Sequence, residues 1–253
     1  MSDPFRLDGR TVIVTGASRG IGAATARAIA ARGGKVVLVA RSEAPLRAIA
    51  DELPTPSAVV AGDVADTQVI GDAITAGEEL GGLWGLVNNA GINPHYQPVS
   101  ATPLSAWDEV LQVNLLGAAA FARAMALYLS EAGEGGRIIN ISSIGGLTGL
   151  PNIGAYNASK AALDGLTRSL AVELGPEGIL CNSIAPGTIT TEMVDDLMAA
   201  NPALKEKLVA KAPLGRLGSV DEAAGPIVFL LTDAAAFITG QTIVVDGGRL
   251  AAG

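Results

Sequence analysis

Short runs of apolar, often β-branched residues alternate along the chain with longer stretches that mix small aliphatic residues with charges. The short runs predict strands at 11–15, 35–40, 57–61, 83–88, 137–141, 179–184 and 242–245. The longer stretches predict helices at 20–32, 43–53, 66–80, 103–130, 153–174 and 220–231, with short helices inside 191–211. This alternation predicts an α/β fold with three layers, in which helices cover both faces of a doubly wound, parallel, seven-stranded sheet.

Composition supports one large core. No linker, repeat or shift in composition divides the 253 residues, so the sequence predicts a single domain over 1–253. Hydrophobic residues make up 49% of the chain and aromatic residues only 4%, so small aliphatic side chains must fill the core. The net charge is −8 and no run of Lys or Arg occurs, which disfavours a nucleic-acid partner.

The N-terminus and the cysteine content bear on the compartment. Residues 1–9 are polar and lack the apolar stretch of a signal peptide. No run of about 18 uncharged apolar residues occurs, so we expect no membrane partner. Cys181 is the only cysteine, which excludes an internal disulfide and suits a reducing compartment. The expected location is therefore the cytoplasm.

A glycine-rich loop joins the first predicted strand to the first predicted helix. Its pattern is G-x-x-x-G-x-G, and such glycines let backbone N–H groups approach a pyrophosphate at a helix N-terminus. The alternative is a glycine-rich turn that binds nothing, but the position directly after the first strand favours a dinucleotide. The predicted cofactor contacts in this loop are Gly16, Ser18, Arg19, Gly20, Ile21 and Gly22.

The end of the second strand bears on the choice of cofactor. An acidic residue there would hold the ribose 2′-hydroxyl of NAD. This chain has Ala40 followed by Arg41, and Arg19 lies in the glycine loop. Arginine suits phosphate geometry, so we expect NADP(H) to be preferred, with NAD(H) possible. The alternative is that both arginines are solvated surface residues.

Three other strand ends can contribute to the same crevice. Asp63 follows the third strand and could accept a hydrogen bond from the adenine amino group, or simply shape a turn. Asn89 follows the fourth strand within Asn-Asn-Ala-Gly, which is either a wall of the crevice or an ordinary turn. The segment after the sixth strand could wrap the nicotinamide end. The predicted contacts are Asp63, Val64, Asn89, Pro186, Gly187, Ile189 and Thr191.

Tyr156 and Lys160 are the strongest candidates for chemistry. They are four residues apart, which places them one turn apart on one helix face. A cationic lysine beside a phenol favours the phenolate, so we expect the pKa of Tyr156 to fall. Such a tyrosine can exchange a proton with an alcohol or carbonyl oxygen, and Ser143 could hold that oxygen if the chain folds back. The alternative is a chance surface pair.

Two further polar residues are informative. Asn114 lies within a predicted helix, where asparagine is mildly disfavoured, and a kink or a bound water would explain it. His95 is the only histidine, and no cysteine cluster accompanies it, so we predict no metal site.

Together these motifs resemble the short-chain dehydrogenase/reductase family in its single-domain, soluble, Rossmann-fold form. The resemblance covers Leu7 to Gly248 and includes the glycine loop, Asn88-Asn89-Ala90-Gly91 and the closing Val245-Asp246-Gly247-Gly248. It implies a catalytic tetrad of Asn114, Ser143, Tyr156 and Lys160. Tyr156, which with Lys160 also contacts the cofactor, would be the acid/base, and Ser143 would polarise the substrate oxygen. Lys160 would hold the nicotinamide ribose and lower the Tyr156 pKa, and Asn114 would fix a water that relays protons.

The resemblance also implies an NAD(P)(H)-dependent oxidoreductase that interconverts a small-molecule ketone and a secondary alcohol. Members that reduce 3-oxoacyl carrier-protein thioesters are similar, and Arg216 is a lone basic candidate for a carrier-protein contact. Alternatives are an NAD-dependent sugar, polyol or steroid dehydrogenase and a non-catalytic dinucleotide sensor. We expect substrate contacts from 93–97, 144–152 and a substrate loop at 188–217, with apolar walls from Leu147, Leu150, Ile153 and Met193.

Association is the last expectation. The family is usually tetrameric, and segment 115–122 carries more apolar residues than one core-facing stripe uses. We therefore expect a homotetramer built through the helices at 108–130 and 156–174.

Overall fold

All seven predicted strands lie in one parallel sheet. The computed structural model describes residues 3–191, 194 and 202–252. Its strands follow the order β3-β2-β1-β4-β5-β6-β7, and every neighbouring pair is parallel. Their bounds are β1 Thr11–Thr15, β2 Lys35–Ala40, β3 Ser57–Ala61, β4 Leu83–Asn88, β5 Gly136–Ile141, β6 Ile179–Pro186 and β7 Thr242–Val245. The predicted doubly wound α/β fold is confirmed.

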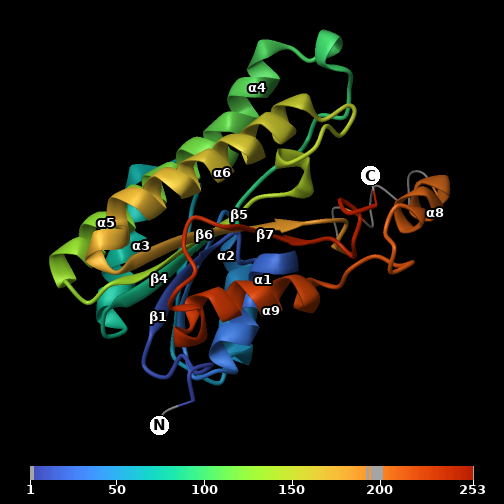
Figure 1. Ribbon diagram of the computed structural model, residues 1–253. Helices are drawn as coiled ribbons and strands as arrows, with labels where there is room; N and C mark the ends of the chain where they lie inside the picture. Colours follow the sequence, from blue (N-terminus) through green and yellow to red (C-terminus); the bar gives the residue numbers. More distant parts are fainter. Residues whose placement is uncertain (1–2, 192–193, 195–201, 253) are drawn as a thin grey trace.

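Helices cover both faces of the sheet, as Figure 1 shows. One face carries α1 (Gly20–Ala30), α2 (Glu43–Glu52) and α9 (Val220–Leu231). The other carries α3 (Thr67–Glu79), α5 (Ala118–Ala132) and α6 (Gly154–Leu174). Successive side chains of a strand enter opposite cores: Val12 and Val14 pack on the first face and Ile13 on the second. Such strands are buried on both sides, which is why their sequences are continuously apolar.

The long helix predicted at 103–130 is not a continuous α-helix. α4 (Leu104–Leu111) passes into a π-helical segment, Gln112–Gly117, before α5 begins. By length and composition alone the whole run Leu104–Ala132 could cross a membrane, with a mean hydropathy of 1.5 in its most apolar window. The same run contains Asn114 and Arg123, and Phe121 and Met125 are buried in the second core. Helices that pack in the core of a globular protein commonly have such a high mean hydropathy.

A chain of buried polar side chains crosses the middle of the sheet. The Asn88 amide on β4 donates to Asn140 Oδ1 on β5 at 3.0 Å, and Asn140 Nδ2 donates to Thr167 Oγ1 on α6 at 2.8 Å. Thr167 Oγ1 lies 2.8 Å from Ser183 Oγ on β6. The three strand residues are register partners, since Asn88 is opposite Asn140 and Asn140 is opposite Ser183. Buried polar groups are costly unless paired, so this chain ties three strands to α6.

Element boundaries differ from the predictions by a few residues. α1 ends at Ala30 rather than 32, just before Gly33 adopts a φ of +86°. β6 continues two residues beyond the predicted end, to Pro186, and pairs with β7 there. Within 191–211 the structure describes α8 (Pro202–Ala210), while 192–193 and 195–201, including Met193, lie outside the described residues. Short 3-10 turns lie outside the predicted elements, at Val99–Ala101, Ile144–Gly146, Gly175–Glu177 and Asp233–Ala235.

Candidate active site

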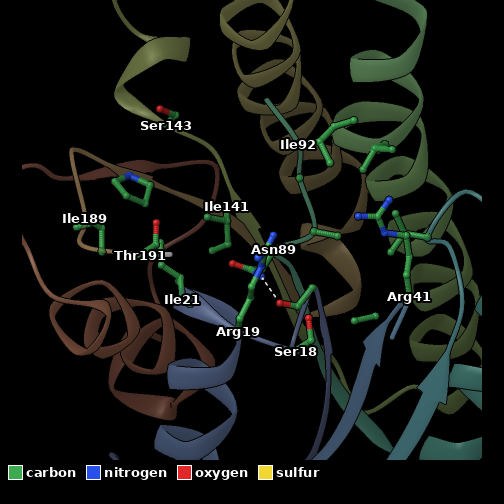
Figure 2. A pocket seen from close by; sticks show the side chains of 18 of the residues that line it. Ser18, Arg19, Ile21, Arg41, Asn89, Ile92, Ile141, Ser143, Ile189 and Thr191 are labelled. Atoms are coloured by element: carbon green, nitrogen blue, oxygen red, sulfur yellow. Dashed lines mark hydrogen bonds between the residues drawn. The ribbon is translucent and has the colours of Figure 1, made fainter. Parts of the chain in front are cut away.

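A cavity of about 640 Å³ opens at the carboxyl edge of the sheet. It lies where the strand order reverses between β1 and β4, the usual ligand position in doubly wound folds. Figure 2 shows Arg41 towards one end, Ser143 and Ile189 towards the other, and Ser18, Arg19 and Asn89 between them. Predicted site residues that line the cavity are Gly16, Ser18, Arg19, Gly20, Ile21, Arg41, Asp63, Val64, Asn89, Ser143, Tyr156, Lys160, Pro186, Gly187, Ile189 and Thr191. Gly22 and Asn114 do not line it.

The glycine loop has the geometry that a pyrophosphate requires. Gly16 and Gly20 adopt φ of +64° and +57°, which favour glycine. A Cβ atom on Gly22 would collide with the Gly16 carbonyl oxygen, so Gly22 lets α1 pack against the loop instead of touching a ligand. Arg19 is the N-cap residue of α1 and its side chain makes no capping bond. The first N–H groups of α1 therefore remain available to an anion in the cavity.

Asn89 holds the glycine loop against the end of β4. Its Nδ2 donates to the carbonyl oxygens of Thr15 at 2.9 Å and Gly16 at 3.1 Å. Thr15 Oγ1 in turn accepts from the backbone N–H groups of Asn89 and Ala90, both at 3.0 Å. The predicted wall residue therefore has a structural function at least as clear as any ligand contact.

The end of the cavity beside Ala40 is lined by one cationic, one neutral and one acidic side chain, which are those of Arg41, Ser42 and Asp63. Arg41 follows β2 and is exposed, and no carboxylate in the described part of the chain forms an ion pair with it. Ser42 is the N-cap residue of α2 but makes no capping bond, and it lines the cavity beside Arg41. Asp63 shapes a turn, because its Oδ1 accepts from the Ala65 N–H at 2.9 Å. This end can accommodate a phosphate next to Ala40.

Ser143, Tyr156 and Lys160 meet at the other end of the cavity. Ser143 follows β5, and its Oγ accepts from the Gly145 N–H at 3.1 Å, which leaves its own proton to donate. Tyr156 and Lys160 lie in the first two turns of α6, with Lys160 Nζ 5.7 Å from the centre of the Tyr156 ring. Lys160 is buried and donates to the Ile141 carbonyl oxygen at 2.7 Å. The predicted fold-back of Ser143 onto α6 is present.

The expected direction of the Tyr156 pKa is wrong for this structure. Burial raises the pKa of the Tyr156 hydroxyl above its usual value, a hydrogen bond with Ser143 lowers it, and the nearby phenol of Tyr96 raises it. The net result is a raised pKa. Lys160 does not reverse it, because its ammonium group is directed to Ile141 O and is itself desolvated. Tyr156 is therefore a protonated phenol at neutral pH.

Burial also acts on Lys160. It lowers the pKa of Lys160 to about 8, against an opposing effect of Asp164 that raises it. The side chain therefore changes charge close to physiological pH, which a solvated lysine does not do.

Asn114 lies behind the cavity and forms hydrogen bonds through both its amide oxygen and its amide nitrogen. Its Oδ1 accepts from Ile92 N–H at 2.8 Å, and its Nδ2 lies 3.0 Å from Ile92 O and 3.1 Å from Ser159 Oγ. These bonds attach the π segment, a local departure from α-helical geometry, to the chain after β4. A Cβ on Gly91 would lie 3.4 Å from both Asn114 Oδ1 and Lys160 Nζ. The two polar groups thus face one small space.

The expected substrate segments are only partly in the cavity wall. Ile189, Thr191 and Val194 line it from 188–217, whereas no residue of 93–97, and only Ser143 beside 144–152, is among the described lining residues. The apolar walls expected from Leu147, Leu150 and Ile153 are likewise absent from that lining. Sequence reasoning missed Ser42, Pro45, Gly62, Ile92, Val113 and Ile141. Ile92 had a signal in its position directly after Asn-Asn-Ala-Gly, and Gly62 and Ile141 had one in their positions at the ends of predicted strands.

Two residues singled out in the sequence, His95 and Arg216, are paired with carboxylates. His95 Nε2 lies 2.8 Å from Glu109 Oε2. Arg216 makes a two-pronged bond to Glu222, at 2.8 and 2.6 Å. Across residues 3–191, 194 and 202–252, no group of three or more His, Cys, Asp or Glu side chains is arranged to hold a metal ion.

Comparisons with known proteins agree with this geometry. A family model described as enoyl-(acyl carrier protein) reductase matches residues 16–249. An L-rhamnose 1-dehydrogenase (NAD(P)(+)) from a Sphingomonas species is 41% identical over 96% of each chain. A 3-alpha-(or 20-beta)-hydroxysteroid dehydrogenase from Mycobacterium bovis is 39% identical over 97% of this chain and 91% of its own.

A solved structure gives the same result for the fold. A gluconate 5-dehydrogenase candidate from Beutenbergia cavernae, crystallised with NADP at low occupancy, has a TM-score of 0.92 and 37% identity. The match covers 98% of this chain and 100% of that one. With the glycine loop, the Ser143-Tyr156-Lys160 constellation and these full-length matches in agreement, the chain belongs to the short-chain dehydrogenase/reductase family.

Proposed function

We propose that the protein is an NAD(P)(H)-dependent oxidoreductase, with a preference for NADP(H), that interconverts a secondary alcohol and a ketone. One observation carries the proposal: a single cavity has an anion-binding glycine loop in its middle and the Ser143-Tyr156-Lys160 group at one end. The rhamnose and hydroxysteroid dehydrogenases described above support the reaction type. The NADP bound to the gluconate dehydrogenase candidate supports the cofactor class.

The positions of the lining residues along the cavity indicate which of them would hold each part of the cofactor. The α1 N-terminus with Gly16, Ser18 and Gly20 would hold the pyrophosphate, and Arg41 and Arg19 the 2′-phosphate. Ile189 and Thr191 would lie beside the nicotinamide, with Pro186 and Gly187 behind them. When bound, the nicotinamide supplies or accepts the hydride. The protein's contribution is to position the substrate and move a proton.

The proton chemistry follows from the hydrogen bonds. During reduction Tyr156 donates its proton to the substrate oxygen, and its raised pKa keeps that proton available at neutral pH. Ser143 donates to the same oxygen, because its Oγ already accepts from Gly145 N–H. Lys160 would hold the nicotinamide ribose with the remaining donors of its ammonium group. Asn114 would fix the segment around Ile92 and, with Lys160, a water in the space beside Gly91 that relays protons.

The known relatives indicate which classes of substrate are the best candidates for this reaction. The L-rhamnose dehydrogenase supports a sugar or polyol as the second candidate substrate alongside simple ketones, and the hydroxysteroid dehydrogenase supports a cyclic alcohol. A carrier-protein thioester gains no support from Arg216, whose charge is already paired with Glu222. We propose that segment 188–217 of this single-domain chain is a substrate loop, since its residues Ile189, Thr191 and Val194 line the cavity.

A substrate panel tests the proposed function. We expect turnover of at least one aldose, polyol, cyclic alcohol or hydroxysteroid with NADP⁺, followed as absorbance of the reduced cofactor. A 3-oxoacyl thioester and a simple ketone with NADPH complete the panel, and each substrate is repeated with the NAD(H) pair. No turnover of any secondary alcohol or ketone with either cofactor, while the cofactor still binds, would favour the non-catalytic sensor.

We also propose that the protein is a cytoplasmic homotetramer. Leu116 and Leu127 on the α5 side of the molecule are 52% and 58% exposed, and Val172 on α6 is 79% exposed. Apolar residues at such positions are typical of a surface that another subunit covers. We expect light scattering at micromolar concentration to give about four times 25.4 kDa. A mass near that of one chain would contradict the tetramer.

A matched pair of variants locates the interface. Leu116→Asp with Leu127→Asp introduces two charges on the proposed surface, and the mass should fall to that of a dimer or monomer. Phe5→Ser is the control, because Phe5 is 53% exposed and lies near Phe229 of α9, on the opposite face of the sheet. It should leave the mass unchanged.

A further inference from the structure

Asp164 is a buried carboxylate that the proposed reaction does not use. It lies one turn after Lys160 on α6, and the two residues are 2% and 4% exposed. A charged side chain is seldom fully buried unless it is paired or hydrogen-bonded, because leaving water is costly. Its presence here therefore needs an explanation.

The hydrogen bonds of Asp164 join three elements at the active-site end of the sheet. Ser142 Oγ donates to Asp164 Oδ2 at 2.9 Å, and Thr242 Oγ1 on β7 donates to Asp164 Oδ1 at 3.2 Å. Ser142 Oγ also lies 3.2 Å from the Lys160 carbonyl oxygen. Ser142 is the residue between Ile141, whose carbonyl accepts from Lys160 Nζ, and Ser143. The carboxylate thus holds the backbone that carries both Ser143 and the acceptor of Lys160.

Asp164 is also the source of negative charge for Lys160. Burial lowers the pKa of Lys160 and the negative charge of Asp164 raises it. Tyr156 is the other titratable group that faces Lys160 from α6. The titratable groups on the described elements packed against α6 are Asp108 and Glu109 on α4, Arg123, Tyr128 and Glu131 on α5, Arg137 on β5, Glu177 after α6 and Cys181 on β6.

We propose that Asp164 is a positioning residue of the active site, which supplies the counter-charge for Lys160 and fixes the Ser142-Ser143 backbone against α6. The effect on turnover rests on the proposed function, whereas the effect on the charge of Lys160 does not. Opposite charges within one helical turn attract even when they do not touch, and burial strengthens the attraction.

Asp164→Asn separates charge from hydrogen bonding. The asparagine oxygen can accept from Thr242 Oγ1, and its amide can donate to Ser142 Oγ, which then donates to Lys160 O alone. The variant therefore keeps the shape and the hydrogen-bonded partners of the site, reverses the direction of the bond to Ser142 and removes the charge. Asp164→Ser provides a second neutral variant if the first folds poorly. Ser142→Ala is the matched control, since it removes a hydrogen bond to Asp164 and keeps the charge.

The first readout is the titration of Lys160 itself. The chain has five lysines, so ¹³Cε-lysine NMR gives few signals, and Lys160→Arg identifies the one required. We expect a midpoint of about 8 in the wild type and one at least about one unit lower in Asp164→Asn and Asp164→Ser. Ser142→Ala should stay close to the wild type. If the Lys160 midpoint is unchanged in both Asp164 variants, the proposal that Asp164 supplies its counter-charge is wrong.

The second readout is the pH profile of ketone reduction. In Asp164→Asn the fall of kcat at alkaline pH should move to lower pH by the same amount as the NMR midpoint. At a fixed pH above the midpoint, kcat should then fall about tenfold for each unit of that shift. Ser142→Ala should lower kcat without moving that limb. A uniform loss of kcat in Asp164→Asn at every pH would overturn the proposal and leave Asp164 a structural residue. If the wild type turns over nothing, the proposed function fails, and the NMR titration still decides the counter-charge.

Discussion

Tyr156→Phe is expected to lower kcat by at least about 10²-fold and up to about 10⁴-fold, the usual range for general acid–base catalysis. The change keeps the aromatic ring and removes only the hydroxyl that lies near Ser143. Since the ring still fills its place on α6, the cofactor should bind as in the wild type, which nucleotide fluorescence would show. The combination of retained binding and lost kcat separates proton transfer from cofactor affinity.

The pH dependence of the reaction rate provides a second test of Tyr156 as the acid/base. Because the pKa of Tyr156 is raised, the protonated form dominates at neutral pH, and reduction should not be limited by it there. Oxidation needs the phenolate as base, so its rate should rise with pH until Tyr156 has titrated. Tyr128→Phe is the control, because the Tyr128 hydroxyl accepts from Leu83 N–H at 3.2 Å, away from the cavity. Should Tyr156→Phe retain most of its kcat, Tyr156 is not the acid/base.

Arg41→Ala is expected to raise KM for NADPH and leave KM for NADH nearly unchanged. Arg41 and Arg19 each offer a charge-assisted hydrogen bond, worth roughly 1.5–3 kcal/mol when well formed. The site is exposed, so we expect a wild-type preference for NADPH of about 10–1,000-fold, with each 1.4 kcal/mol giving tenfold. The measurement is kcat/KM for both cofactors in the wild type and the variant.

Two further variants make that result specific. Ala40→Asp would place a carboxylate at the end of β2, repel the 2′-phosphate and favour NADH. Arg47→Ala is the matched control, because Arg47 lies on α2, does not line the cavity and pairs with Glu43 at 2.8 Å. Equal or better use of NADH by the wild type would remove the NADPH assignment and leave Arg41 a surface residue.

The strands were predictable because each is a short, largely apolar run, and most of them end near glycine, asparagine or proline. β1, β2, β3, β4 and β7 have the predicted bounds. The π segment around Asn114 was not predictable, since the side chain of Asn114 bonds to Ile92, 22 residues away in sequence. Local propensity gives no information on such a partner.

The candidate site was predictable in membership but not in electrostatics. Motif spacing was enough to identify Ser143, Tyr156 and Lys160, which the structure places together at one end of the cavity. It gave the wrong direction for the pKa of Tyr156, because the sequence shows a neighbouring charge but not the burial that outweighs it. Asp164 escaped notice for the same reason: on a helix of mixed polarity, nothing in the sequence marks an aspartate as buried.

The chain of buried polar side chains across the sheet affects which register the strands adopt during folding. Runs such as Val36–Val39 or Ile138–Ile139 are apolar on both faces, so a slip of two residues would still bury hydrophobic side chains. A slip at β5 would instead move Asn140 away from Asn88, Thr167 and Ser183 and leave several amide and hydroxyl groups without partners inside the protein. Each such loss costs about 1–3 kcal/mol. The buried polar side chains thus disfavour misaligned intermediates during folding, and Asn140→Leu should slow the productive pairing of β4, β5 and β6 even though it adds apolar surface to the core.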